Sequence, residues 1–182
     1  MTNETVLIEQ LKNVQTKEKA FRELISLYKE RLYWHIRKIV ISHDDTDDVL
    51  QNTFIKVYRN ISKFNQDSKL FSWMYRIATN ESISFINKRA KERNIAVSEM
   101  HEQLTSSLES DNYFSGEEIQ EILQMAIATL PQKQQLVFNM KYFDDLKYTE
   151  ISEILGTTVG ALKASYFHAV KKIESYIKNK TN

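Results

Sequence analysis

Apolar residues recur at intervals of three and four along most of this chain, which is the spacing that places them on one face of an α-helix. The repeat is clear from Phe21 to Ile39, from Leu50 to Ile61 and from Phe71 to about Arg89, and it returns from Ile119 to Ile127. The chain has only 3 Gly and 1 Pro, so it lacks the residues that β-hairpin turns require. The sequence therefore predicts an all-α protein.

The helical repeat fades in one internal segment, which divides the chain. Ser, Glu, Thr, Asn and Asp dominate from Asn94 to about Ser115, and residues 94–124 hold seven acidic residues and no Lys or Arg. A segment of this composition cannot bury enough apolar surface to fold alone. We therefore expect two small helical bundles, over residues 1–93 and 117–182, joined by a flexible acidic linker over 94–116.

The residue content argues against several kinds of site. The absence of Cys excludes disulfides, Cys-ligated zinc and a thiol nucleophile. Four scattered His and the lack of a phosphate-binding Gly loop leave little to build a catalytic site from, so we expect neither an enzyme nor a cofactor. No apolar run approaches the roughly 18 residues of a membrane span, and the amino terminus lacks a signal peptide. We expect a soluble, cytoplasmic protein without membrane insertion.

One acidic cluster suggests a metal site, and it consists of Asp44, Asp45, Asp47 and Asp48. A calcium-binding loop that began at Asp44 would need Gly at the position of Val49 and Glu at the position of Ile55, so that pattern fails. Acidic residues are favourable at the amino terminus of a helix, which accounts for the cluster without a metal. We therefore expect no metal site.

The segment from Tyr148 to Lys178 predicts a helix, a tight turn and a second helix. Thr149 can cap the first helix, and Gly156 can provide the turn; Thr157 or Thr158 can cap the second helix. The residues expected to be buried in the second helix are Val159, Leu162, Tyr166, Ala169 and Ile173. The opposite face carries small and then basic residues, namely Ala161, Lys163, Ala164, Ser165, His168, Lys171 and Lys172. This face suits a DNA-recognition helix, and a helical hairpin with a solvated outer face fits the same pattern.

Three blocks of the sequence resemble one family. The carboxyl-terminal block LPQKQQLVFNMKYFDDLKYTEISEILGTTVGALKASYFHAVKKIE resembles the promoter-reading region 4 of bacterial sigma factors, in particular the small extracytoplasmic-function (ECF) group. DDVLQNTFIKVYRNISKF resembles the polymerase-binding helix of the group, and FSWMYRIATNESISFINKRAKER resembles its strand-melting and upstream-reading helix. The blocks follow the order of the family from about Phe21 to Ile177. The resemblance implies an ECF-type sigma factor, which directs core RNA polymerase to promoters and assists promoter opening in transcription initiation.

In the amino-terminal bundle, the resemblance implies contacts with polymerase and with DNA at the minus-ten element. Asp48, Gln51 and Phe54 would dock on the clamp helices of the largest polymerase subunit. Six residues of the third helix would contact the minus-ten strand or nearby phosphates, and they are Trp73, Asn80, Lys88, Arg89, Lys91 and Arg93. A polar amide such as Asn80 has weak structural reason to stand in mid-helix, and the family pattern has Asn at the matching place.

Some of these assignments have a structural alternative. Phe54 has a core spacing with Leu50 and Val57, and Trp73 stands where an aromatic ring more often fills a bundle. Stacking on an unpaired base is worth roughly 1 to 3 kcal/mol, so Trp73 would need other groups to help hold a strand open. The basic residues at the end of the third helix are also favourable there without a ligand, because cations stabilise a helix carboxyl terminus.

In the carboxyl-terminal bundle, the resemblance implies recognition of the minus-thirty-five element and contact with the flap of the second-largest polymerase subunit. The residues that would contact DNA are Thr158, Lys163, Ser165, His168, Lys171 and Lys172. Many members carry Arg at or near the positions of Ser165, His168 and Val170, so the resemblance leaves the base preference of this chain open. His168 fits an exposed polar residue as well as a base or phosphate contact.

The linker and the net charge bear on how the two bundles would act together. Some 22 residues at about 3.3 Å each can span on the order of 70 Å, comparable with two turns of duplex DNA. The formal net charge is only +1, which favours tight DNA binding only after docking on polymerase. The group makes an anti-sigma factor a further candidate partner. The alternative is a stand-alone helix-turn-helix regulator that binds a palindromic operator as a dimer.

Overall fold

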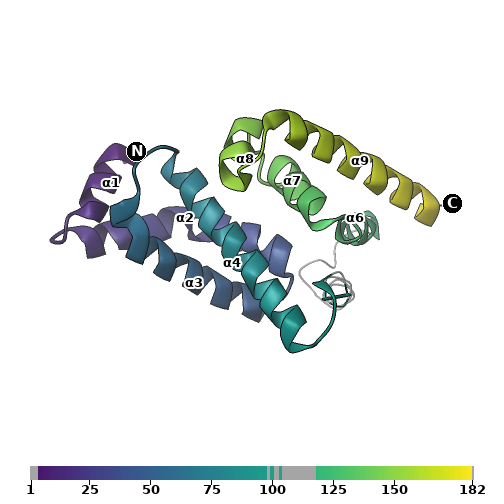
Figure 1. The fold of residues 1–182 in the computed structure, drawn as a ribbon, viewed down its shortest axis with the longest axis horizontal. Helices are drawn as coiled ribbons and strands as arrows, with labels where there is room; N and C mark the ends of the chain where they lie inside the picture. The colour runs from purple at the N-terminus through teal and green to yellow at the C-terminus, as the bar shows by residue number, and fades with distance from the viewer. Residues whose placement is uncertain (1–3, 98, 101–102, 104–117, 182) are drawn as a thin grey trace.

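The structure, a computed structural model of the chain, describes all residues except 1–3, 98, 101–102, 104–117 and 182. Every regular element among the described residues is a helix, so the all-α prediction is confirmed. The helices form two groups that pack against each other (Figure 1). Most of the predicted linker, 94–116, lies outside the described residues.

The first bundle contains α1 (Glu4–Lys12), α2 (Lys17–Val40), α3 (His43–Asn60), the short 3₁₀ turn η1 (Ile61–Lys63) and α4 (Leu70–Glu92). The helices α2, α3 and α4 pack on one another, and α1 lies against α2 and η1. Their apolar stripes meet in a common core. The helical repeat of the sequence therefore marks the inner faces of these three long helices.

The short helix α1 is not part of the repeat that predicts the other helices. It is held by three buried residues, Leu7, Ile8 and Leu11. Its Glu4 carboxylate accepts a hydrogen bond from the backbone N–H of Leu70 (3.1 Å). That N–H belongs to the first turn of α4, where the first N–H groups have no partner within the helix. The amino terminus of the chain thus helps to fix where α4 begins.

The acidic cluster lies at the amino terminus of α3, as the sequence indicates. Ser42 precedes the helix, and its hydroxyl accepts a hydrogen bond from the N–H of Asp45 (3.4 Å). Asp44 and Asp45 stand in the first turn, where negative charge is stabilised by the helix dipole. Within the described residues, no group of three or more His, Cys, Asp or Glu is arranged to hold a metal ion.

The second bundle contains α6 (Glu118–Ala128), α7 (Gln132–Tyr142), α8 (Tyr148–Leu155) and α9 (Val159–Thr181). Gly156 ends α8 in the left-handed conformation (φ 62°), so the predicted turn of the helix-turn-helix is confirmed. The prediction that Thr149 caps α8 is wrong. The helix begins at Tyr148, directly after Lys147, so Thr149 stands inside its first turn. The Glu150 carboxylate accepts a hydrogen bond from the N–H of Lys147 (3.0 Å), as the third helical residue does in a capping box.

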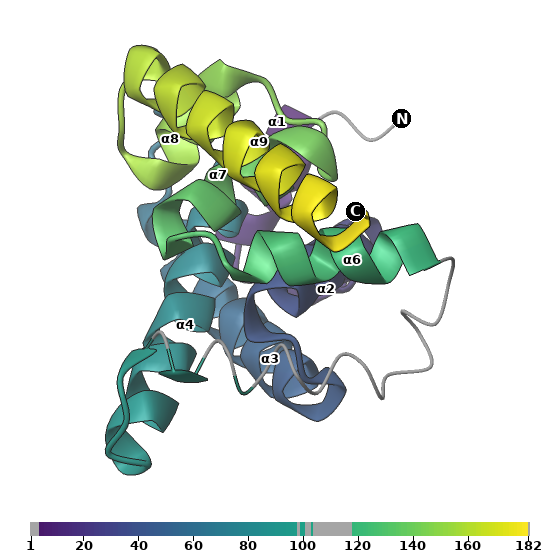
Figure 2. The same ribbon diagram turned by 90° about the vertical axis from the view of Figure 1, so that its right-hand side faces the viewer.

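One apolar core is continuous between the two bundles. It contains the inner residues of α1 to α4 together with residues of the second bundle, which are Val137, Met140, Leu146, Ile151, Ile154 and Leu162. A smaller core joins α6, α7 and α9. The helix α8 packs on α4, and α7 lies against α2 (Figures 1 and 2). The two bundles are therefore docked on each other.

Candidate functional site

The outer face of α9 is formed by the residues expected to contact DNA. Lys163, His168, Lys171 and Lys172 are exposed, and Ser165 is half-buried. The helix is held in this rotation by its buried residues, which are Leu162, Ala169 and Ile173. Val159 and Tyr166, also expected on the inner face, are half-buried.

The first turn of α9 has the shape that close approach to another molecule requires. Thr158 precedes the helix, and its hydroxyl accepts a hydrogen bond from the N–H of Ala161 (3.3 Å), so it is the cap. Ala161 and Ala164 are exposed and short. Lys163 stands between them, and its ammonium lies 6.0 Å from the centre of the Tyr148 ring. The arrangement places small side chains beside a cation, which suits a helix that enters the major groove.

Phe167 belongs to the α9 face, although it is not among the residues expected to contact DNA. Its side chain is 58% exposed, in contrast to the neighbouring Tyr166, which occupies the core-spaced position and is half-buried. The Lys171 ammonium lies 5.8 Å from its ring centre, and the His168 ring contacts it edge to face at 5.7 Å. The signal available in the sequence is its position four residues after Lys163 and four before Lys171, which puts it on their side of the helix.

On α4, the two residues expected to meet the opened strand stand in different surroundings. Asn80 is exposed at mid-helix. Trp73 is half-buried, and its ring lies 5.1 Å from that of Phe64 and packs on the main core. The Trp73 ring therefore helps to fill the bundle, which is the structural alternative that its position in the sequence suggested. Only part of its surface remains available for stacking on a base.

The basic end of α4 consists of Lys88, Arg89, Lys91 and Arg93. Lys91 and Arg93 are exposed, and Arg93 donates a hydrogen bond to the side-chain oxygen of Gln103 (3.2 Å). Arg89 is half-buried and pairs with the carboxylate of Asp45 at the start of α3. Lys88 pairs with Glu92 (3.8 Å) on the surface of the same helix. Part of this basic group therefore also joins α3 to α4.

On α3, two of the three residues expected to dock on polymerase are exposed and the third is buried. Asp48 and Gln51 are exposed. Phe54 is buried, with its ring edge to face against Phe21 (6.2 Å between centres), so the core role expected from its spacing holds. Beside these residues runs an open apolar groove of about 490 Å³, and its lining residues are Phe21, Ile25, Gln51, Phe54, Ile55, Tyr58 and Arg59.

The structure does not gather the predicted residues into one site. They form three surfaces: the α9 face, the exposed side of α4 with its basic end, and the exposed side of α3. The basic end of α4 projects away from the second bundle in both views (Figures 1 and 2). Such a set of separate polar surfaces suits an extended partner better than a small molecule. Among the described helices, none is long and apolar enough to cross a membrane.

Comparison with known families matches both bundles. The family model described as Sigma-70 region 2 matches residues 24–92, and the model described as Sigma-70, region 4 matches residues 120–173. The chain is 31% identical over 170 residues to the ECF RNA polymerase sigma factor SigW of Bacillus subtilis, with 88% of this chain and 90% of that protein covered. It is 27% identical over 180 residues to the ECF RNA polymerase sigma-E factor of Escherichia coli K12, with 94% and 93% covered.

Two solved structures have a similar fold. One is CnrH in complex with the cytosolic domain of CnrY, with a TM-score of 0.69, 19% identity and 96% of both chains covered. The other is the sigma factor RpoE in complex with the anti-sigma factor NepR from Bartonella quintana, with a TM-score of 0.67, 19% identity, and 88% of this chain and 98% of that chain covered. At this identity the likeness concerns the fold.

Proposed function

This chain belongs to the ECF group of the sigma-70 family, and from that premise we propose that it binds core RNA polymerase, directs it to specific promoters and assists promoter opening. The observation that carries the proposal is the pair of family matches, region 2 at 24–92 and region 4 at 120–173, in one chain and in that order. A stand-alone helix-turn-helix regulator has no need of the first match.

In this proposal, residues 1–93 form the polymerase-binding and minus-ten domain. The exposed Asp48 and Gln51 dock on the clamp helices of the largest polymerase subunit. Phe54 supports that surface from the core. Asn80 contacts the opened strand, and the half-buried ring of Trp73 offers its free edge to a base. The cations at the basic end of α4 contact phosphates upstream, which needs no base-specific geometry.

Residues 117–182 form the minus-thirty-five domain, and residues 94–116 are the linker between the two. The α9 face enters the major groove, with Lys163, Lys171 and Lys172 neutralising phosphates. Ser165 and His168 lie toward the base edges, where a hydroxyl and an imidazole read hydrogen-bonding groups. Thr158 holds the first turn at the DNA backbone through its cap. The same domain contacts the flap of the second-largest subunit.

The proposal also includes where the protein acts and a second protein partner. The protein acts in the cytoplasm, because RNA polymerase and its promoters are there, and it does so without a cofactor or catalytic chemistry of its own. An anti-sigma factor is a partner, supported by the two structures of similar fold, each of which contains a sigma-like chain bound to a second protein.

The proposal is tested by mixing the purified protein with core RNA polymerase, resolving the mixture by size exclusion and transcribing a panel of genomic promoter fragments with the complex. Co-elution with promoter-specific transcripts is expected. Failure to co-elute, together with tight binding of the protein alone to a palindromic duplex, would instead establish the stand-alone regulator.

Matched variants separate the two surfaces in the same assay. Asp48→Ala is expected to weaken co-elution, whereas Asp47→Ala removes the same charge from the neighbouring exposed position and leaves co-elution intact. Replacing Lys163, Lys171 and Lys172 together with Ala is expected to preserve co-elution and abolish promoter-specific transcripts. Equal effects of the two aspartate variants would rule out the assigned docking surface.

A further inference from the structure

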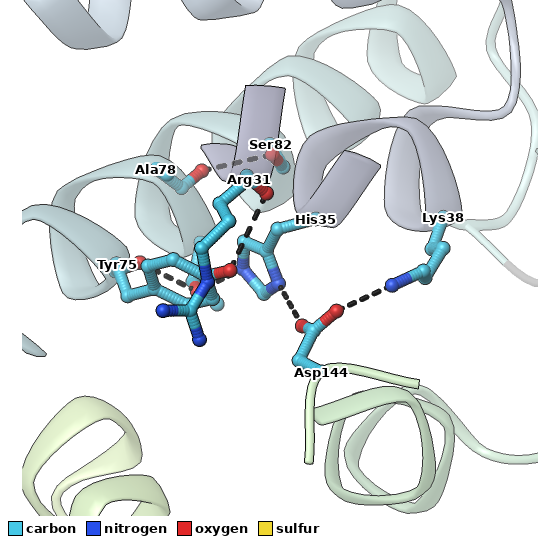
Figure 3. Close-up of polar contacts among 8 residues, drawn as sticks. Arg31, His35, Lys38, Tyr75, Ala78, Ser82 and Asp144 are labelled. Carbon is cyan, nitrogen blue, oxygen red and sulfur yellow. Dashed lines mark hydrogen bonds and ion pairs between the residues drawn. The ribbon is translucent and has the colours of Figure 1, made fainter. Parts of the chain in front are cut away.

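A polar junction joins the two bundles at the loop between α7 and α8 (Figure 3). The Asp144 carboxylate, in that loop, accepts a hydrogen bond from His35 Nδ1 (3.1 Å) and pairs with the ammonium of Lys38, both on α2. The His35 ring is 1% exposed, and its Nε2 lies 2.8 Å from the hydroxyl oxygen of Thr79 on α4. One acidic group of the second bundle is therefore held by side chains anchored in two helices of the first.

The junction fixes one particular docking of the bundles. The Asp144 side chain is 6% exposed, and burial alone would raise its pKa, but the hydrogen bonds and charges of His35 and Lys38 outweigh burial and hold the pKa below its ordinary value. The Tyr75 ring packs at a tilt against the His35 ring, with 4.4 Å between their centres, and keeps the imidazole in place. A shift of the loop along α2 would leave a buried charge without its partner, which is strongly unfavourable.

The neighbouring contacts lie at Lys69, which directly precedes α4, and on the amino-terminal half of that helix. The Lys69 ammonium pairs with the Glu150 carboxylate of α8 (3.0 Å), and the Arg76 guanidinium donates to the carbonyl of Glu153. The apolar core is continuous across the same boundary. The first helix of the helix-turn-helix therefore covers part of the helix that carries Trp73 and Asn80.

This docking is incompatible with reading a whole promoter. Val159, where α9 begins, is six positions after Glu153, which touches α4, and even an extended chain spans at most about 3.6 Å per residue. The start of α9 therefore lies within roughly 22 Å of that contact. Two promoter elements about two helical turns apart are separated by roughly 68 Å of duplex. Asn80 lies about 6 Å along α4 from Arg76, and His168 lies about 14 Å along α9 from Val159. With about 7 Å for the reach of the Arg76 side chain, Asn80 and His168 lie within roughly 50 Å of each other, so the docked chain cannot place them on two elements that far apart.

We propose that the Asp144 junction with His35, Lys38 and Thr79 is a latch that holds the free chain in a closed, inactive arrangement, and that the second bundle must detach before the chain can engage a promoter. The inference rests on the proposed sigma function for its biological meaning, while the closed arrangement itself is a property of the free chain. The latch uses groups that have no place among the residues assigned to DNA or polymerase.

The closed arrangement is tested by a distance measurement in the free protein. The chain has no Cys, so Lys29→Cys on α2 and Lys178→Cys on α9, both exposed, provide two spin-label positions, one in each bundle. Double electron–electron resonance is expected to give one narrow distance distribution. Asp144→Asn is expected to broaden the distribution and shift it to longer distances, because the neutral amide cannot replace the carboxylate between two donors.

The neighbouring residue supplies a matched control. Asp145 lies in the same loop, but its side chain is 96% exposed and pairs with Lys141 (3.6 Å) of the same bundle. It has a positive φ (50°), which Asn tolerates well, so Asp145→Asn removes the same charge without strain. Its distance distribution is expected to match that of the parent. Equal distributions for Asp144→Asn and the parent, with helicity preserved, would overturn the latch, and so would a parent that is already broad.

The inactivity of the closed state is tested by locking it. Lys69→Cys and Glu150→Cys place two thiols where an ion pair now joins α4 to α8, and a bismaleimide with a cleavable disulfide spacer can bridge them. The bridged protein is expected to lose promoter-specific transcription by at least about tenfold, with recovery after reduction. Full activity while bridged would overturn the proposal. No activity even after reduction would count against the sigma function, and the distance measurement would still decide whether the chain is closed.

Discussion

The α9 face and the exposed side of α4 both carry cations, uncharged polar side chains and an aromatic ring, but they differ in what else those residues do. On α9 the register is set by residues on the opposite side, such as Leu162 and Ala169, and the outward residues are exposed except for the half-buried Ser165. On α4, Trp73 packs on Phe64 and Arg89 pairs with Asp45. The α4 residues therefore hold the first bundle together while they face the expected ligand.

This difference has a consequence for substitution. A residue that serves only binding can change without loss of fold, so α9 can alter its base preference freely. A residue that serves both binding and packing cannot, so the side of α4 is constrained by the first bundle. Comparing one substitution on α4 with one on α9 should therefore separate effects on stability from effects on promoter activity. The difference in stability between the two variants of a pair should become smaller as the α4 residue contributes less to packing.

The largest effect is expected for the aromatic pair. Trp73→Ala removes a half-buried ring from the core and should destabilise the chain by about 3 kcal/mol, the lower end for such truncations. Phe167→Ala removes an exposed ring and should change stability by less than about 0.5 kcal/mol. Urea denaturation followed by circular dichroism measures both.

A conservative variant distinguishes packing from base contact at the same position. Trp73→Phe retains much of the apolar contact, so it should recover most of the stability. If it also restores open-complex formation in full, the ring acts through the fold; if opening stays impaired, the ring also meets DNA. A Trp73→Ala variant as stable as the parent would contradict the packing role.

The next largest effect is expected for the two cations Arg89 and Lys172. Arg89→Met breaks the half-buried pair with Asp45 and leaves that carboxylate without its cation, which should cost about 1 to 2 kcal/mol of stability. Lys172→Met should leave stability unchanged to within about 0.5 kcal/mol. Both should reduce by about 0.9 the slope of log affinity against log salt for the polymerase complex on promoter DNA, one phosphate contact each.

The result that would contradict this pairing is a loss of stability for Lys172→Met as large as that for Arg89→Met. The double variant Asp45→Asn, Arg89→Met then serves as a check, because removing both charges should recover part of the stability but none of the salt slope.

The helical fold and the α9 face could be predicted from sequence because both follow from local spacing. Residues at intervals of three and four share a helix face whatever they pack against, so the exposure of Lys163 and His168 follows once the buried positions are known. The turn at Gly156 is local in the same sense, since a left-handed residue at a helix end favours Gly.

The features that sequence did not predict depend on contacts between distant segments. Glu4 takes up the first N–H of α4 across 66 residues, and Asp144 meets His35 across 109. No spacing rule pairs such residues. The amino-terminal end of α8 shows a smaller limit of prediction from sequence. Thr149 and Glu150 both carry oxygens that can accept from backbone N–H groups, and which of them does so depends on the residue at which the helix begins.

Asn80 is the α4 residue that should behave like a residue of the α9 face. It is exposed and stands in mid-helix, where Ala is more favourable than Asn by about 0.5 kcal/mol. Asn80→Ala should therefore leave the chain as stable or slightly more stable, while promoter opening by the polymerase complex falls. Permanganate reactivity of the minus-ten thymines measures the opening. A stable variant with unchanged opening would remove Asn80 from the strand-contacting residues.

The smallest effect is expected for Lys88, which forms a surface pair with Glu92 (3.8 Å) on the same helix. An exposed pair of this kind contributes about 0.3 to 0.5 kcal/mol at most, because water screens both charges. Lys88→Gln should therefore be nearly silent in unfolding, yet lower the salt slope of promoter binding by about 0.9 if the side chain meets a phosphate. Lys29→Gln, an exposed lysine of α2, is the control and should leave the slope unchanged. If Lys88→Gln left the slope unaltered, Lys88 would make no phosphate contact and would serve only at the helix carboxyl terminus. DNA contact at this end of α4 would then be confined to the neighbouring cations.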